Sequence, residues 1–137
     1  QSGSDLSIIT TGDVTAACFE AALLLEKEKI SVEIIKLHCL KPIDKQTILA
    51  SAQKTQKIVT VENHNITGGL GTIVAELLAE NYLYPGETNE AGEAILYRLG
   101  IPDSFGESGT MEKIYQKFQL DAKGIYQQIK TWYNLVK

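Results

Sequence analysis

Short runs rich in β-branched residues alternate along the chain with longer stretches in which apolar residues recur three and four positions apart. The β-rich runs lie at residues 6–12, 32–38, 57–62 and 94–100. Helical spacing follows the first three runs, at residues 14–30, 44–54 and 70–82, and returns after residues 110 and 121. Strands that alternate with helices imply right-handed crossovers and a mostly parallel sheet between helical layers. The pattern therefore predicts a three-layer α/β/α domain with a mostly parallel sheet of four strands.

Four polar residues are predicted to cap helices. Asp13, Asp44, Thr110 and Asp121 each stand directly before an apolar-periodic stretch, which is the position that N-cap residues prefer. Thr110 is the better interpretation of the ESGT segment at 107–110, where a nucleophilic role for Ser108 is the alternative.

Apolar and sulfur-containing side chains at helical spacing are predicted to be buried. The stripes at 111–118 and 125–136 are both expected to belong to the core. Cys18 and Cys39 are the only cysteines and form no CxxC pair, which argues against a disulfide scaffold and a zinc site. Because apolar residues flank each cysteine, both are expected to be small buried hydrophobes.

Length and charge limit the functional classes. The 137 residues fit one domain, which we place at 5–137, and we expect Gln1–Ser4 to be a remnant of cloning. The net charge is −4, with no basic patch, so nucleic acid is not an expected partner. The longest uninterrupted apolar run, Ala21–Leu25, is far shorter than the about 20 residues that span a bilayer. Since no leader pattern opens the chain, we expect a cytoplasmic protein without a membrane partner.

The segment VENHNITGGLG at 61–71 is the main candidate for chemistry. Gly68, Gly69 and Gly71 precede a predicted helix, whose N-terminal amides and dipole can bind an anion. The G-G-x-G spacing is neither a dinucleotide fingerprint nor a P-loop. Glycines that permit a tight strand-to-helix corner are the alternative, and it is the one we favour.

Glu62 and His64 belong to the same segment, at the predicted carboxyl end of a strand. That edge of an open parallel sheet is where ligands bind, and a Glu can orient an imidazole for acid–base work. A structural or interface hydrogen bond explains the pair equally well. His38 at the end of the second β-rich run and Arg98 near the end of the fourth are expected to be structural. From the residues alone, no catalytic constellation or metal-ligand spacing is found.

Four stretches together resemble the C-terminal domain of transketolase. They are residues 5–44, 58–80, 97–121 and 124–133. The first, which ends in K-P-I-D, is shared with 1-deoxy-D-xylulose-5-phosphate synthase and with the beta subunits of 2-oxoacid dehydrogenases. The run GIPDSFGESGT at 100–110 looks like transketolase, especially forms whose two halves are separate polypeptides.

The resemblance implies an enzyme that moves two-carbon ketol units between sugar phosphates with thiamine diphosphate and a divalent metal, Mg²⁺ or Ca²⁺. The family's catalytic, cofactor-binding and metal residues lie on its other domains, so none is expected here. The fragment alone is then inactive and helps dimer packing, with the remaining domains or an N-terminal subunit as its partners. The family sheet has five strands, the first of which is an antiparallel edge strand, so the resemblance extends the expected sheet to four to five strands. We expect this chain to begin after that edge strand and to leave a sheet edge exposed.

Other functions stay open at this point. A free-standing interaction or regulatory module could reuse the fold, and the chain could belong to either of the two related enzyme classes. A third hypothesis is an anion or interface site built from Glu62, His64, Gly68, Gly69 and Gly71.

Overall fold

The computed structural model describes residues 1–82, 93–103 and 110–136. The strands are β1 (Leu6–Thr10), β2 (Val32–Lys36), β3 (Lys57–Asn65) and β4 (Ile95–Ile101). The helices are α1 (Thr15–Lys27), α2 (Lys45–Thr55), α3 (Leu70–Tyr82), α4 (Met111–Lys117) and α5 (Ala122–Leu135). The predicted alternation of strands and helices is confirmed, but β3 extends to Asn65 instead of ending near residue 62.

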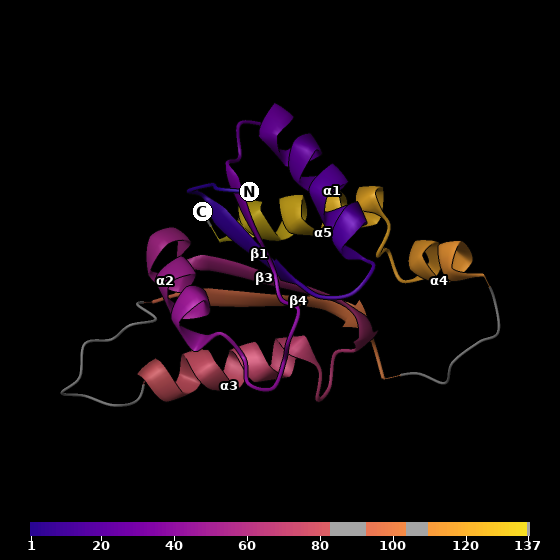
Figure 1. Cartoon of the computed structure of the whole chain (residues 1–137). Helices are drawn as coiled ribbons and strands as arrows, with labels where there is room; N and C mark the ends of the chain where they lie inside the picture. Colours follow the sequence, from indigo (N-terminus) through magenta and orange to yellow (C-terminus); the bar gives the residue numbers. More distant parts are fainter. Residues whose placement is uncertain (83–92, 104–109, 137) are drawn as a thin grey trace.

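The four strands form one sheet in the order β2-β1-β3-β4, and every pair is parallel (Figure 1). The two central strands consist of buried residues along most of their length, as strands covered on both faces do. The predicted mostly parallel sheet is therefore confirmed with four strands in the described part of the chain.

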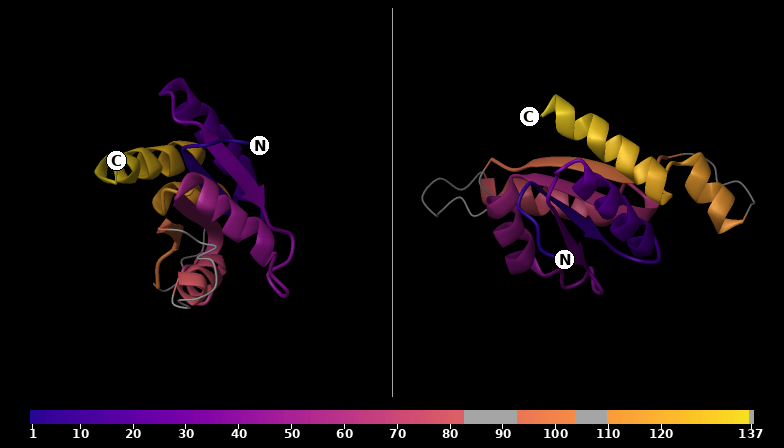
Figure 2. Two further views of the ribbon diagram at one scale, coloured as in Figure 1. Left: turned by 90° about the vertical axis from the view of Figure 1, so that its left-hand side faces the viewer. Right: turned by 90° about the horizontal axis from the view of Figure 1, so that it is seen from above.

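Two helical layers cover the sheet. Helices α1 and α5 lie on one face, whereas α2 and α3 lie on the other (Figures 1 and 2). The first face buries Cys18, Leu25, Leu120, Ile125 and Ile129 against strand residues. The second buries apolar residues of α2 and α3, namely Ile48, Leu49, Ala52, Leu70, Val74, Leu77 and Leu78. Two cores on opposite faces of one sheet define the three-layer α/β/α architecture.

Three of the four predicted helix caps are confirmed. The side chains of Asp44, Thr110 and Asp121 accept hydrogen bonds from backbone amides in the first turns of α2, α4 and α5. The prediction for Asp13 is wrong, because α1 begins after Val14 and has no side-chain cap. Asp13 instead accepts hydrogen bonds from residues distant in the sequence.

Burial was predicted correctly for one cysteine and one helical stripe. Cys18 is buried, and burial raises the pKa of its thiol to about 12 despite a hydrogen bond to Thr10. Cys39 is exposed, contrary to expectation, because β2 ends at Lys36 and leaves it in a surface loop. The stripe on α5 reaches the core, but α4 has no buried residue and Met111 is 50% exposed. Tyr115 and Phe118 of this stripe nevertheless pack against the same core and are partly buried, so the prediction for residues 111–118 is confirmed only in part.

Residues 1–4 contact the outer edge of β2. The Gln1 carbonyl accepts from the Ile34 amide at 3.1 Å, and the Gln1 amino group donates to the Ile34 carbonyl at 3.5 Å. Gly3 is buried, and a Cβ there would come within 2.1 Å of the Val32 carbonyl carbon. Residues 1–4, which were expected to lie outside the domain, thus pack against the sheet.

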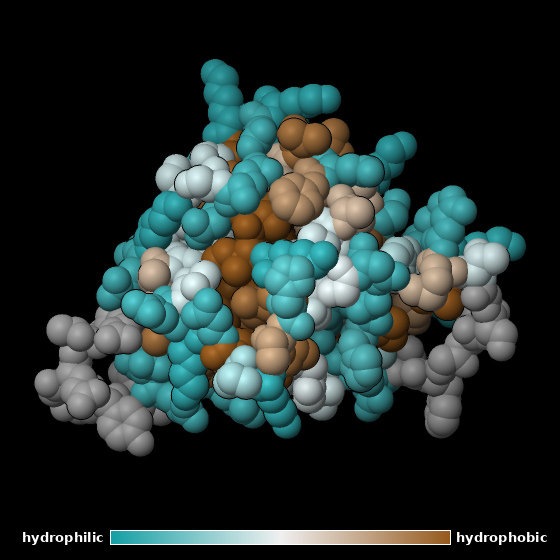
Figure 3. All heavy atoms as spheres, in the orientation of Figure 1, coloured by the Kyte–Doolittle hydropathy of each residue, from teal (hydrophilic) through white to brown (hydrophobic). Residues whose placement is uncertain are grey.

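The surface is mixed, with apolar atoms in a band across an otherwise polar face (Figure 3). The exposed large apolar side chains in the described part of the chain are Phe19, Leu23, Ile95, Met111 and Leu135. No helix within the described ranges is both long enough and apolar enough to cross a membrane. Ser108, the alternative nucleophile of the ESGT segment, lies outside the described residues.

Candidate functional site

The candidate segment begins inside β3, where the strand is irregular. The register between β3 and β4 shifts between Val61 and Asn65, as at a β-bulge or a similar irregularity. Bulges re-aim side chains and are frequent near functional sites. Here the bulge separates the two candidate residues: Glu62 is only 1% exposed, whereas His64 is exposed. The predicted Glu–His pair therefore divides between the interior and the surface.

The Glu62 carboxylate lies against the N-terminus of α3. One oxygen accepts a hydrogen bond from the Leu70 amide at 2.8 Å, and the other accepts from the Gly71 amide at 2.9 Å. These amides are among the donors that a helix leaves unpaired at its start, and the helix dipole favours a negative charge there. The chain therefore supplies its own anion to the position that an external anion would occupy.

Two of the glycines are required by close packing. A Cβ on Gly69 would lie 1.9 Å from Glu62 Oε2, and one on Gly71 would lie 2.8 Å from Arg98 Cδ. Gly68 is different, because nothing lies within 4 Å of its Cβ position while its φ of +80° is a conformation that L side chains rarely adopt. The three glycines thus serve the corner in two ways, by close approach and by backbone conformation.

Other amides of the loop also have acceptors within the chain. The Thr67 amide donates to Asn65 Oδ1 at 2.8 Å, and the Gly68 amide donates to Thr72 Oγ1 at 2.9 Å. Arg98 Nη1 anchors the same loop, at 3.5 Å from the Ile66 carbonyl and 3.4 Å from Thr72 Oγ1. Because these donors already bond to acceptors of the chain, the loop leaves few hydrogen-bond donors for an external anion.

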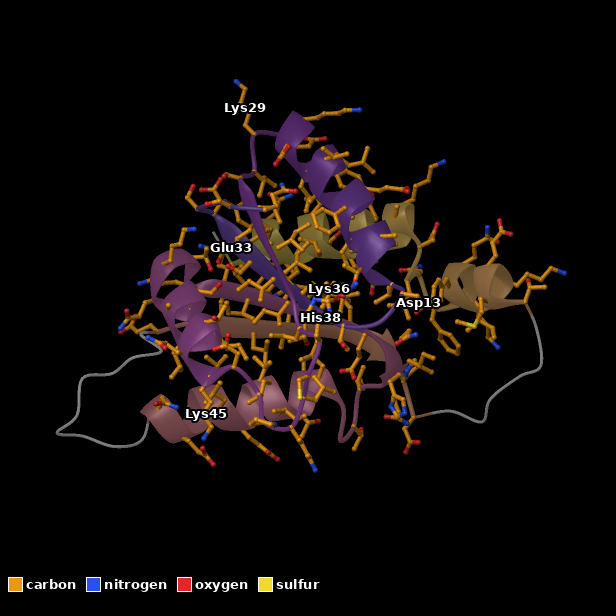
Figure 4. All side chains as sticks on the ribbon, in the orientation of Figure 1. Asp13, Lys29, Glu33, Lys36, His38 and Lys45 are labelled. Carbon is orange, nitrogen blue, oxygen red and sulfur yellow. The ribbon has the colours of Figure 1, made fainter. Side chains whose placement is uncertain are left out.

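The structure brings Glu62, Gly69 and Gly71 together and leaves His64 and Gly68 at the surface. His38 is exposed in the loop after β2, and β1 separates that strand from β3 in the sheet (Figure 4). Among the described residues, Thr60 Oγ1 is buried without a hydrogen-bond partner, 2.9 Å from the Cβ position of Gly71. It lies in close packing beneath the corner.

A polar cluster that the sequence did not predict lies at the carboxyl edge between β1 and β3. The Tyr115 hydroxyl donates to Asp13 Oδ1 at 2.7 Å, and the Asn63 amide donates to the same oxygen. Burial, together with the hydrogen bond to Asp13, raises the pKa of the Tyr115 phenol to about 12. Asp13 lies beside α4 in Figure 4, so this cluster ties α4 to the sheet. A separation of 102 positions between Tyr115 and Asp13 explains why no local signal predicted it.

A second unpredicted cluster surrounds Glu33 of β2, near the amino ends of strands β1 and β2. Ser51 and Ser7 donate to Glu33 Oε2 at 2.6 and 3.0 Å, and Lys54 Nζ lies 2.9 Å from Oε1. Burial by itself raises the pKa of Glu33, but the hydrogen bonds from Ser51, Lys54 and Ser7 outweigh it, so the pKa lies below its ordinary value. The cluster joins α2 to the edge strand β2 and to the neighbouring central strand β1.

A metal site is not built by the described side chains. No group of three or more His, Cys, Asp or Glu residues in ranges 1–82, 93–103 and 110–136 could hold a metal ion. A diphosphate cofactor held through a divalent cation needs such oxygen ligands. These residues therefore do not fit thiamine diphosphate with its metal.

The geometry defines a class of protein: an open parallel α/β/α domain in which a buried carboxylate of the chain itself caps the helix after the third strand. The family model described as "Transketolase, C-terminal domain" matches residues 1–125. The chain belongs to the transketolase C-terminal domain family, as its sequence motifs predicted.

Individual relatives agree with this assignment. The chain is 39% identical over 123 residues to the 6-deoxy-6-sulfo-D-fructose transketolase subunit of Clostridium sp. (strain MSTE9), covering 90% of this chain and 35% of the relative. It is 35% identical over 131 residues to 1-deoxy-D-xylulose-5-phosphate synthase of Syntrophotalea carbinolica, covering 95% of this chain and 19% of that enzyme. A solved split gene transketolase, described as an "inactive beta4 tetramer", superposes with a TM-score of 0.84 at 34% identity, covering 100% of this chain and 42% of that one. The chain thus spans less than half the length of each of these relatives.

Proposed function

We propose that this chain is the C-terminal part of a thiamine diphosphate-dependent transferase that moves two-carbon ketol units between sugar phosphates. The observation that carries the proposal is the combination of 34% identity and a TM-score of 0.84 with a split gene transketolase over the whole chain. Its setting would be cytoplasmic carbohydrate metabolism, in the pentose phosphate pathway.

The chain's own contribution would be architectural. Thiamine diphosphate and its Mg²⁺ or Ca²⁺ would be held by the remaining domains or by an N-terminal subunit, because the described residues of this chain do not fit them. A relative that is named a transketolase subunit, and of which this chain covers 35%, supports such a division of labour. The assembled enzyme would be a homodimer, and residues 5–137 would act as one domain within it.

The β3–α3 corner would serve this assembly as an interface element. Glu62, Gly69 and Gly71 form its interior, whereas His64 and Gly68 lie at its surface, at the carboxyl edge of the sheet. Since the amides of the loop are bonded to acceptors of the chain, we favour contact with a neighbouring domain over binding of an anion.

A second candidate is the C-terminal domain of a 1-deoxy-D-xylulose-5-phosphate synthase. A 35% identity over 95% of the chain favours keeping it. The beta subunit of a 2-oxoacid dehydrogenase and a stand-alone regulatory module are further candidates, for which no specific observation of this structure speaks.

Reconstitution tests the proposal. The chain is mixed with the separately purified polypeptide that forms the thiamine-binding part of the same protein. Ketol transfer between sugar phosphates is then measured with thiamine diphosphate and Mg²⁺. We expect activity from the combination and none from the chain alone. Formation of 1-deoxy-D-xylulose 5-phosphate would select the second candidate, and ketol transfer by the isolated chain would contradict the architectural role.

A further inference from the structure

A hollow lies between strand β4 and helix α5, away from the β3–α3 corner. Its volume is about 280 Å³. Its lining residues are Tyr97, Gln119, Gln127, Gln128, Thr131, Trp132 and Leu135. Ligand pockets usually measure about 300–1,000 Å³ and enclose their ligand, so this smaller, open hollow suits one protruding group better than a whole metabolite.

The lining combines an aromatic floor with an uncharged rim. The rings of Tyr97 and Trp132 stack with centroids 5.4 Å apart, and Leu135 at the rim is 80% exposed. The remaining lining residues are three glutamines and a threonine. Aromatic residues at the centre with few charges are typical of protein interfaces. A sugar phosphate would lack a cation to bind, because no lysine or arginine lines the hollow.

The hollow adjoins an open edge of the sheet. Strand β4 is last in the strand order, and no described strand pairs with its outer side. Ile95 on this strand is 39% exposed. Ile95 and the lining residue Tyr97 are two positions apart on β4 and so belong to the same face of the strand. An unpaired edge strand beside a hollow is a surface on which another protein segment can dock.

Charge distinguishes this part of the chain from the rest. Residues 111–137, which carry most of the hollow, contain five lysines and two acidic residues, a net charge of +3. Residues 1–110 contain eight basic and fifteen acidic residues, a net charge of −7. Two copies that docked hollow to hollow would bring positive charge against positive charge, whereas a partner with acidic groups would be attracted.

We propose that the hollow receives an apolar side chain, flanked by acidic groups, from the part of the longer enzyme outside this domain. The inference rests on the proposed function, because only a chain that works within a larger enzyme needs such a contact. The relatives provide for one: this chain covers 35% of the first and 42% of the solved structure, so both contain a large further part. Interfaces between domains are more polar than obligate ones, which agrees with the rim of glutamines.

The only tryptophan of the chain makes the hollow observable. Incorporation of 5-fluorotryptophan gives one ¹⁹F resonance, from Trp132. The labelled chain is titrated with the unlabelled, separately purified thiamine-binding part encoded with it. We expect the Trp132 resonance to shift as the complex forms, and Leu135→Asp to weaken association at least tenfold. Lys123→Glu, which reverses an exposed charge on α5, should weaken it several-fold at low salt.

A matched control separates the hollow from general surface effects. Leu23→Asp changes an apolar side chain of α1 that is 57% exposed, and it should alter association less than twofold. Association that leaves the Trp132 resonance and the Leu135→Asp affinity unchanged would overturn the inference while the proposed function stands. Concentration-dependent shifts of the chain alone would overturn it in favour of a second copy. If no binding between the wild-type chain and the thiamine-binding part is detected, the proposed function fails together with the inference.

Discussion

The β3–α3 corner and the β4–α5 hollow differ in whether their side chains find partners within the chain. At the corner, a buried carboxylate and two close-packed glycines satisfy the start of α3 from within the chain. At the hollow, a stacked aromatic pair and an 80% exposed leucine stay open to solvent. The corner is therefore expected to govern the stability of the isolated chain, whereas the hollow should matter only when a partner is present.

The largest effect is expected for Glu62→Ala at the corner. The change removes two hydrogen bonds to a charged acceptor, each contributing about 1.5–3 kcal/mol, and leaves the Leu70 and Gly71 amides unpaired in the interior. The free energy of unfolding should fall by about 3–5 kcal/mol, measured by urea denaturation followed by circular dichroism. Glu62→Gln keeps an acceptor oxygen and should lose clearly less. Equal, small losses for both variants would mean that the carboxylate does not hold the corner.

Gly69→Ala should destabilise the chain by about 2–3 kcal/mol, as overpacking in a filled site does. The added Cβ would lie 1.9 Å from Glu62 Oε2, so the cost should shrink when Glu62 is also replaced by Ala. Gly68→Ala is the matched control, since it meets open space and costs only its backbone strain, about 1 kcal/mol. A Gly69→Ala cost that is unchanged in the Glu62→Ala background would refute the proposed contact.

Sequence patterns predicted the corner because its parts are close in the chain. Glu62 lies eight positions from Leu70, so a strand, a glycine turn and a helix start could be inferred together. The division between a buried Glu62 and an exposed His64 could not be predicted, because it depends on a bulge in the pairing of β3 with β4. The hollow was missed for a similar reason: Tyr97 and Trp132 meet only after α5 folds back over β4.

Local signals also failed where a distant partner competes for the same side chain. Asp44 caps α2 as its position suggests, but Asp13 bonds instead to Asn63 and Tyr115. Periodicity likewise overestimated burial on α4, where Tyr115 and Phe118 are only partly buried against the core. Parallel strands and long helices were predictable from pattern, whereas contacts between elements required the assembled structure.

A pH series extends the comparison to a second internal carboxylate. The pKa of Glu33 lies below its ordinary value in the folded chain, because the hydrogen bonds from Ser51, Lys54 and Ser7 outweigh burial. Its stabilising contribution is therefore complete above the ordinary glutamate pKa of about 4.3 and is lost as the pH falls through the lower folded value. Glu33→Gln should cost about 1–2 kcal/mol at pH 7 and flatten the decline in unfolding free energy below pH 4. The same slope in variant and wild type would contradict this assignment.

The smallest effect on the isolated chain is expected at the hollow. Because the Leu135 side chain is 80% exposed, Leu135→Asp should change the free energy of unfolding by less than about 0.5 kcal/mol. Urea denaturation of the chain alone measures this value, beside Glu62→Ala as the sensitive reference. A loss above 1 kcal/mol would mean that Leu135 packs within the fold and that the hollow is part of the core. If stability is unchanged while association with the thiamine-binding part is lost, the hollow serves a contact outside the chain. This property distinguishes the hollow from the β3–α3 corner, whose side chains stabilise the chain itself.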